Sequence, residues 1–267
     1  MKQLNKYYLE DHAPVIPDGK TVEPTDDIQI WIKCAGRKDL YTSLADVLAD
    51  SVCLAALMAD DNAVDYLVRS TTWTTMCANV DAMTDIGLNN YCANTLLANS
   101  TWLTAICNSV YFESVLNVKV PTMTSNNTPE GECFMDTPLG GGQIYQAFDG
   151  NDSTYAMGYQ AGGPASGSLW IGYTFVNPMR LVMCRAYTRV YSYYSGFVVQ
   201  SGNTKSELAS LTAISTTGIG TKDVKSIFLN CEPRTTYRAI LYETHGAAGS
   251  YFFPDVTELQ FYGRKDI

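Results

Sequence analysis

Side-chain oxygens are concentrated in the segment Asp149–Thr154, which reads DGNDST. Carboxylate, amide and hydroxyl oxygens are the ligands that Ca²⁺ prefers. An EF-hand is excluded, because Thr154 stands where that loop needs Gly and Gln160 stands where it needs the closing Glu. Two interpretations stay open: a calcium site that uses Asp149, Asp152 and Thr154, and a metal-free turn whose Asp and Asn side chains bond to the backbone.

Two clusters of aromatic and polar residues have the composition of a carbohydrate-binding site. A sugar needs an aromatic ring against its apolar face and a few placed hydrogen-bonding groups. The alternative is that these rings pack the ends of a β-domain or a contact between subunits, since the chain contains 18 Tyr. The candidate carbohydrate-binding residues are Arg185, Tyr191, Tyr193, Tyr194, His245 and Tyr251.

Catalytic motifs are missing from the sequence. The segment 163–168 does not form G-x-S-x-G, and Leu139–Gly142 lacks the Lys-Ser/Thr of a phosphate-binding loop. The eight Cys form no C-x-x-C pair and are accompanied only by His12 and His245, so buried thiols in a reduced compartment are favoured over a zinc site. The sequence therefore predicts a protein that is not an enzyme.

The charge balance limits the partners of the chain. A formal charge of −9 and a pI near 4.7 argue against a nucleic-acid-binding surface. No apolar run approaches the roughly 18 residues that are needed to span a bilayer. The first residues, MKQLNKYY, lack the apolar core of a signal peptide. We expect a protein made in the cytoplasm, without membrane insertion.

Between residues 39 and 117, apolar residues three positions apart recur in units of nine or ten residues. Leu54/Leu57, Met83/Ile86 and Leu103/Ile106 are such pairs. An Asp, Asn or Ser stands three or four positions before most pairs, as at a helix N-terminus. This spacing predicts helices of about two turns, roughly 12 Å long. Helices this short are unstable alone, so we expect them to pack into a small stack.

The flanking parts of the chain have different patterns. Residues 1–38 contain Pro14, Pro17 and Pro24, which favours an extended arm. Residues 118–267 show the alternation of strands separated by Gly/Asn-rich turns. The predicted architecture is an N-terminal arm (1–38), a stack of short helical repeats (39–117) and an antiparallel β-sandwich (118–267).

The C-terminal part resembles the discoidin (coagulation factor 5/8 type C), galactose-binding-like family. Four segments follow in the family's order: QAFDGNDST at 146–154, LWIGYTF at 169–175, FVVQSGN at 197–203 and VTELQFYG at 256–263. The family's Trp after the Thr is missing, and Tyr155-Ala156-Met157 stands there. The resemblance implies a jelly-roll sandwich and a structural calcium held by the turn together with Glu258.

The arm and the repeats resemble virion proteins of tailed bacteriophages, on the segments Thr21–Trp31 and Leu44–Ser51. The resemblance implies a head- or tail-attached fibre or decoration protein of the virion, commonly trimeric, which contacts other virion proteins through its arm and repeats. Two functions follow as expectations. Either the β-sandwich binds carbohydrate on the host or its surroundings, or the chain is a purely structural connector whose β-domain binds another virion protein.

Overall fold

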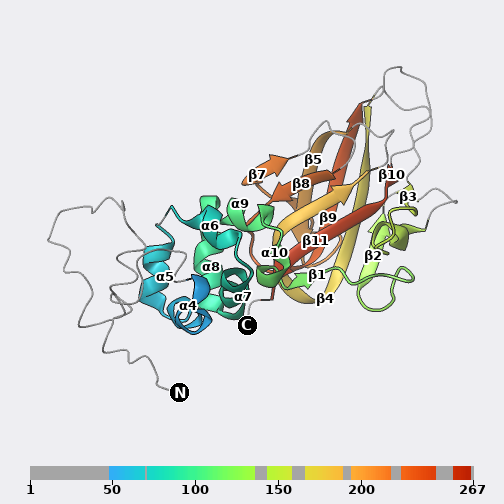
Figure 1. Cartoon of the computed structure of the whole chain (residues 1–267). Coiled ribbons are helices and arrows are strands. Elements are labelled where there is room, and N and C mark those ends of the chain that lie inside the picture. The colour runs from blue at the N-terminus through green and yellow to red at the C-terminus, as the bar shows by residue number, and fades with distance from the viewer. Residues whose placement is uncertain are drawn as a thin grey trace. The chain divides into compact units, whose positions relative to one another are not determined.

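The computed structural model of the chain describes residues 48–69, 71–135, 143–157, 166–188, 194–217, 224–244 and 255–265. The chain divides into two compact units, Met1–Val115 and Leu116–Ile267, and each is described by itself (Figure 1). The predicted arm of residues 1–38 and the first apolar pair, Leu44/Val47, lie outside the described residues. Within the described ranges, no helix is long and apolar enough to cross a membrane.

The first unit is a series of short helices with one to a few residues between them. The longest have nine residues, close to the two turns that the repeat predicts. Their bounds are α4 Ser51–Met58, α5 Asp61–Leu67, α6 Trp73–Cys77, α7 Val80–Leu88, α8 Asn90–Ala98, α9 Ser100–Asn108 and α10 Phe112–Val115.

Asparagine side chains start three of these helices. Asn79 Oδ1 accepts a hydrogen bond from Ala82 N at 2.8 Å, and Asn89 Oδ1 accepts one from Cys92 N at 2.8 Å. Asn99 does the same for the first turn of α9. Asn89 is also the C-cap of α7, and Asn99 is the C-cap of α8. One extended residue therefore ends a helix and caps the next, which explains the ten-residue spacing.

The helices contact neighbours in the sequence and also helices three places away. These latter contacts are α4 with α7, α7 with α10, α5 with α8, and α6 with α9. The apolar pairs of the repeat supply the core, and Trp102 is fully buried with its ring edge-on to Trp73 at a centroid distance of 6.5 Å. A stack with three helices per turn buries an apolar stripe that no single two-turn helix could bury alone.

The regular elements described in the second unit are β-strands, apart from one 3₁₀ turn. Their bounds are β1 Val118–Lys119, β2 Glu132–Met135, β3 Ala156–Met157, β4 Ser166–Tyr187, β5 Tyr194–Gly202, β6 Ala209–Ser210, β7 Ser215–Thr217, β8 Val224–Phe228, β9 Arg234–Thr244, β10 Asp255–Val256 and β11 Glu258–Arg264, with a 3₁₀ turn η1 at Ile144–Ala147. All pairings between these strands are antiparallel.

The long strand β4 joins two sets of strands. Its first half pairs with β2 and β9, and its second half pairs with β11 and β8. One core cluster contains Leu169 and Leu241 from the first set together with Cys184 and Phe261 from the second. Two antiparallel layers around one apolar core make a β-sandwich, as the sequence predicts.

The sequence predicts a turn at Asn177-Pro178, and there the structure differs. The strand β4 runs through both residues, and its pairing register is interrupted between Thr174 and Met179. Proline has no N–H to give to a ladder, so it stands where the strand changes partners. The turn signal marks the corner between the two layers and not the end of a strand.

Candidate functional site

The segment Asp149–Thr154 forms a compact turn held by its own side chains. Asp149 Oδ1 accepts a hydrogen bond from Asn151 N at 2.9 Å, and Asp149 Oδ2 accepts one from the Thr154 hydroxyl at 2.7 Å. Asn151 Oδ1 accepts from Ser153 N at 3.1 Å. Gly150 has a φ of 70°, the left-handed region that favours glycine. These are the Asx turns that the metal-free interpretation of this segment predicts.

Glu258, at the start of β11, lies against this turn although it is distant in the sequence. Its Oε2 accepts a hydrogen bond from Gly150 N at 3.0 Å, and its Oε1 accepts one from Gln260 Nε2 at 2.8 Å. Burial, and less strongly the nearby charges of Asp149 and Asp152, raise the pKa of the Glu258 carboxyl to about 7. The structure thus places Glu258 against the backbone of the turn that contains Asp149, Asp152 and Thr154.

The donor chemistry of this turn fits Ca²⁺, which takes carboxylate, hydroxyl and backbone oxygens. The buried Glu258 carboxylate lies close enough to Asp149 and Asp152 for their charges to affect its ionisation. In the described part of the chain, no three His, Cys, Asp or Glu side chains are grouped to hold a metal ion. A bound Ca²⁺ would therefore also need amide, hydroxyl or backbone oxygens of the turn.

Four of the six candidate carbohydrate-binding residues belong to the segments 188–193 and 245–254, and the strand ends that flank these segments lie side by side. Tyr194, the first residue of β5, pairs directly with Glu243 near the end of β9. The backbone carbonyl of Tyr187, the last residue of β4, accepts hydrogen bonds from Thr257 N at 3.0 Å and from the Thr257 hydroxyl at 3.2 Å. The end of β4 before 188–193 therefore lies beside the residues that follow 245–254, and the start of β5 lies beside the end of β9.

Of the six candidates, two fall on described backbone. Arg185 lies within β4, half-buried, and its Nε donates to the Ser226 hydroxyl of β8 at 3.4 Å. Tyr194 begins β5. Tyr191, Tyr193, His245 and Tyr251 lie outside the described residues.

The interior near these strand ends is polar, which the sequence did not predict. Lys225 has 0% exposure, and its Nζ donates to the Thr188 hydroxyl at 3.1 Å. Asp255 and Thr257 are also buried. Buried polar groups need partners, so this end of the core is held by specific hydrogen bonds.

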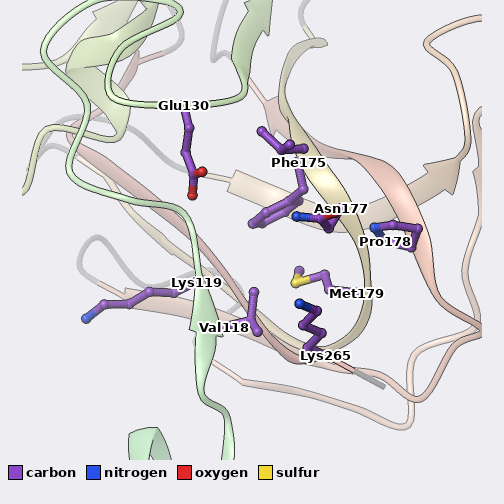
Figure 2. Close-up of a pocket in the computed structure, with 9 residues that line it drawn as sticks. Val118, Lys119, Glu130, Phe175, Asn177, Pro178, Met179 and Lys265 are labelled. Carbon is purple, nitrogen blue, oxygen red and sulfur yellow. The ribbon is translucent and has the colours of Figure 1, made fainter. Parts of the chain in front are cut away.

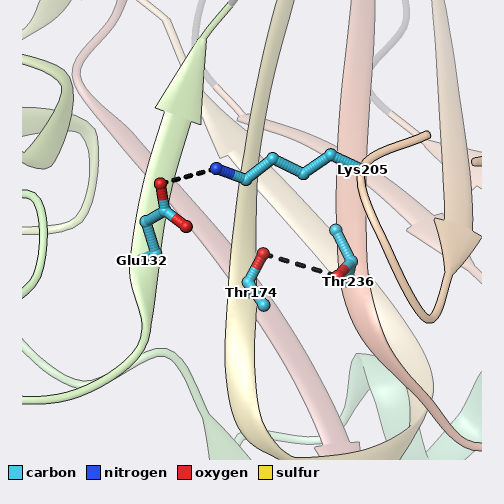
Figure 3. Close-up of polar contacts among 4 residues, drawn as sticks. All are labelled: Glu132, Thr174, Lys205 and Thr236. Atoms are coloured by element: carbon cyan, nitrogen blue, oxygen red, sulfur yellow. Dashed lines mark hydrogen bonds and ion pairs between the residues drawn. The ribbon is translucent and has the colours of Figure 1, made fainter.

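The outward-facing side of the β2–β4–β9–β5 layer also carries polar and aromatic residues. The Arg238 guanidinium lies over the Trp170 ring, 4.1 Å from its centroid. Figure 3 shows Lys205 reaching across this layer to Glu132, with an N–O distance of 2.5 Å, and the neighbouring hydroxyls of Thr174 and Thr236 3.4 Å apart. The alternation along Leu169–Val176 predicts the outward position of Trp170, but its partner Arg238 depends on a strand pairing that the alternation does not specify.

A small cavity lies beside the corner of β4, away from every predicted site residue. Its volume is about 110 Å³, and Figure 2 shows the Glu130 side chain pointing toward the space beside Phe175 while Lys119 points away. Ligand pockets usually have about 300 Å³ or more. The cavity is too small for an oligosaccharide.

Six of the cysteines in the described part of the chain are buried or half-buried. Cys77, Cys92, Cys107, Cys133 and Cys184 are buried, and Cys231 is half-buried. Burial raises the pKa of Cys77 and of Cys133 to about 12. Such thiols remain protonated at neutral pH and act as small apolar residues.

No family model and no curated protein matches the chain. About half of it is similar to solved carbohydrate-binding modules. A CBM32 module from Clostridium perfringens, in complex with GalNAc-β-1,3-galactose, covers 55% of this chain and 100% of its own, with 11% identity and a TM-score of 0.41. The family 32 module of C. perfringens NanJ, in complex with galactose, covers 54% and 99%, with 12% identity and a TM-score of 0.39.

A chitosan-binding module of a chitosanase/glucanase from Paenibacillus sp. covers 52% of this chain and 96% of its own, with 18% identity and a TM-score of 0.38. None of these three proteins comes from a bacteriophage. The β-sandwich is assigned here from the strand pairing and the shared core described above.

Proposed function

We propose that the chain is a non-catalytic virion protein whose β-sandwich binds carbohydrate. One observation supports the binding site above the others: the segments 188–193 and 245–254, which contain Tyr191, Tyr193, His245 and Tyr251, leave the sandwich from adjacent strand ends. Two segments that are anchored together bring residues from distant parts of the sequence to one site.

In this site, the tyrosine rings stack against the apolar faces of sugars, and His245 and Arg185 donate hydrogen bonds to hydroxyls. The buried hydrogen bond from Lys225 to Thr188 joins β8 to the residue that follows β4. Ordered strand ends reduce the entropy that the loops lose when they bind a ligand.

Calcium binding is part of the proposal. Asp149, Asp152, Thr154 and Glu258 would hold Ca²⁺, which would tie the turn to the start of β11 and neutralise crowded carboxylates. A calorimetric titration of the full chain with Ca²⁺ tests this. Heat release and a higher melting temperature are expected, and the absence of both would remove the metal.

The short-helix stack and the arm place the binding unit on the particle, in contact with other virion proteins and in a homotrimer. The virion and the trimer are inferred from the resemblance of residues 21–51 to phage virion proteins. Light scattering on the purified chain at micromolar concentration tests the trimer, and a monomer would contradict it.

A glycan array that displays host-cell polysaccharides tests carbohydrate binding by the full chain. Tyr193→Ala and Tyr251→Ala should each remove most of the signal, whereas Val176→Ala, at an exposed position on the corner of β4, should leave it unchanged. Unchanged binding by both tyrosine variants would move the site elsewhere. No binding by the wild-type chain would favour the alternative, a structural connector whose β-domain binds another virion protein.

A further inference from the structure

The side of the β2–β4–β9–β5 layer that faces away from the core carries aromatic and polar side chains around the buried Ile240 and Thr236. In the paired strands, Trp170 lies opposite Ile240 and Val198, and Gly172 lies opposite Arg238. Residues that alternate with these, such as Leu169 and Leu241, point into the core. We call this surface, made by Phe134, Trp170, Val198, Gln200, Arg238 and Tyr242, the outer sheet face.

Arg238 is held in one orientation on this face. Its guanidinium lies over the Trp170 ring at 4.1 Å from the centroid. Its Nε donates to Gln200 Oε1 at 2.9 Å, and its Nη2 donates to the same oxygen. Gln200 Nε2 in turn donates to the Ser210 hydroxyl at 3.2 Å. A guanidinium that is already stacked and hydrogen-bonded loses little entropy when it binds an anion.

A second cation lies over a second ring of the same face. Phe134 packs flat on the sheet because Gly172 has no side chain; a Cβ there would lie 2.4 Å from the Phe134 ring. Lys205 Nζ lies 4.9 Å from the centre of that ring and forms the ion pair with Glu132 (Figure 3). Aromatic rings and cations thus occur together at both places.

The local charge of the face differs from that of the chain. Arg238 and Lys205 contribute two positive charges and Glu132 contributes one negative charge, a sum of +1, in a chain whose formal charge is −9. Tyr242, with 41% exposure, adds an accessible ring two positions along β9 from Ile240, the pairing partner of Trp170, and four positions from Arg238. Flat rings suit the apolar faces of sugars, and the positive charge of a guanidinium attracts carboxylates.

We infer that the outer sheet face binds a linear acidic glycan, with Arg238 on a hexuronic acid carboxylate and with Tyr242 and Trp170 against sugar rings. This site is distinct from the proposed site at the ends of β4, β5 and β9, because Trp170, Val198 and Arg238 lie in the interior of their strands, while Tyr242 lies two residues before the end of β9. It gives the protein a second carbohydrate specificity, for polysaccharides that carry negative charge.

Isothermal titration of the full chain tests the inference, with polygalacturonate as the probe and fully methyl-esterified polygalacturonate as the matched neutral polymer. The wild type should bind the acid form and not the ester. Arg238→Gln and Tyr242→Ala should each weaken binding by at least about tenfold, as is typical of residues that contribute most of the binding energy. Lys265→Gln removes the same charge outside this face and should change the affinity by less than about twofold.

Arg238→Lys keeps the positive charge but lacks the planar guanidinium, so its affinity for polygalacturonate should lie between those of the wild type and Arg238→Gln. If Arg238→Gln does not fold, Arg238→Lys replaces it in the test. Equal binding of acid and ester, equal loss in Lys265→Gln and Arg238→Gln, or no binding to polygalacturonate would each overturn the inference. Tyr193→Ala should leave polygalacturonate binding intact. If Tyr193→Ala loses its glycan-array signal and still binds polygalacturonate, the two sites are separate.

Discussion

The two units of the chain use polar residues in opposite ways. In the helical unit, Asn79, Asn89 and Asn99 are polar residues at helix ends, where they satisfy the N–H groups that each helix leaves open. In the sandwich, charged residues such as Lys225, Glu258 and Arg264 are buried. Burial of charge is costly and needs specific partners, so it favours a single arrangement of side chains. The helical unit thus places these polar side chains at the ends of its helices, and the sandwich encloses polar side chains in its interior.

The largest expected effect concerns the core of the helical stack. Trp102→Ala removes a fully buried ring that packs on Trp73 and should cost roughly 3–5 kcal/mol in the free energy of unfolding. Denaturant unfolding followed by Trp fluorescence and circular dichroism measures this.

Leu88→Ala, at a position with 80% exposure, is the control and should cost less than about 0.5 kcal/mol. Similar losses in both variants would contradict the burial of an apolar stripe within the stack.

The second effect concerns a buried charge of the sandwich. The pKa of the Glu258 carboxyl is raised from 4.5 to about 7 in the folded chain. The folded chain therefore binds more protons than the unfolded chain between these values, so stability is highest below this range and falls as the pH rises through it. The melting temperature in chelator-containing buffer should fall from pH 5 to pH 8.

Glu258→Gln keeps an oxygen for Gly150 N and removes the titration, so this part of the pH dependence should disappear. An identical slope in the variant would show that another group is responsible. Saturating Ca²⁺ should restore the melting temperature of the wild type at pH 8 and have little effect on the variant, if the proposed metal site exists.

A smaller effect is expected for the helix caps. Asn89→Ala removes the acceptor for Cys92 N, and the cost should be about 1 kcal/mol. Asn89→Asp keeps an acceptor and should retain most of the stability. Equal destabilisation by Ala and Asp, measured by denaturant unfolding, would mean that the side chain does not act as a cap.

The smallest effect should come from the ion pair on the outer sheet face. The side chains of Lys205 and Glu132 are 43% and 45% exposed, so Lys205→Ala should cost about 0.2–1 kcal/mol or less at low salt. The loss should shrink further in 0.5 M NaCl because exposed charges are screened. A loss of stability above about 2 kcal/mol that does not depend on salt would show that Lys205 stabilises the fold by packing on Phe134 and not by its charge.

Patterns in the sequence predicted most of the helical unit, because each repeat carries its own cap and its own apolar pair. They also predicted the alternation of Leu169–Phe175, in which Leu169, Ile171, Tyr173 and Phe175 are buried. They did not predict the continuous β4, because Asn177-Pro178 has the composition of a turn and the change of partners depends on strands that follow later in the chain.

The candidate site was predicted in part. The side-chain bonds within Asp149–Thr154 are local and follow from the residue types. The contact of Glu258 with Gly150 joins residues that are 108 positions apart, and it was expected from the family resemblance alone. The stacking of Arg238 on Trp170 and the burial of Lys225 depend on register and on which strand lies next to which, and no local pattern encodes either.

Amide hydrogen exchange of the full chain, with and without the glycan that gives the strongest array signal, tests most directly whether recognition belongs to the sandwich. Protection on binding should appear in peptides that cover 185–196 and 242–258, and the helices of 51–115 should exchange as in the free chain. Protection in the helical unit without any change in the sandwich would contradict the division of roles between the two units.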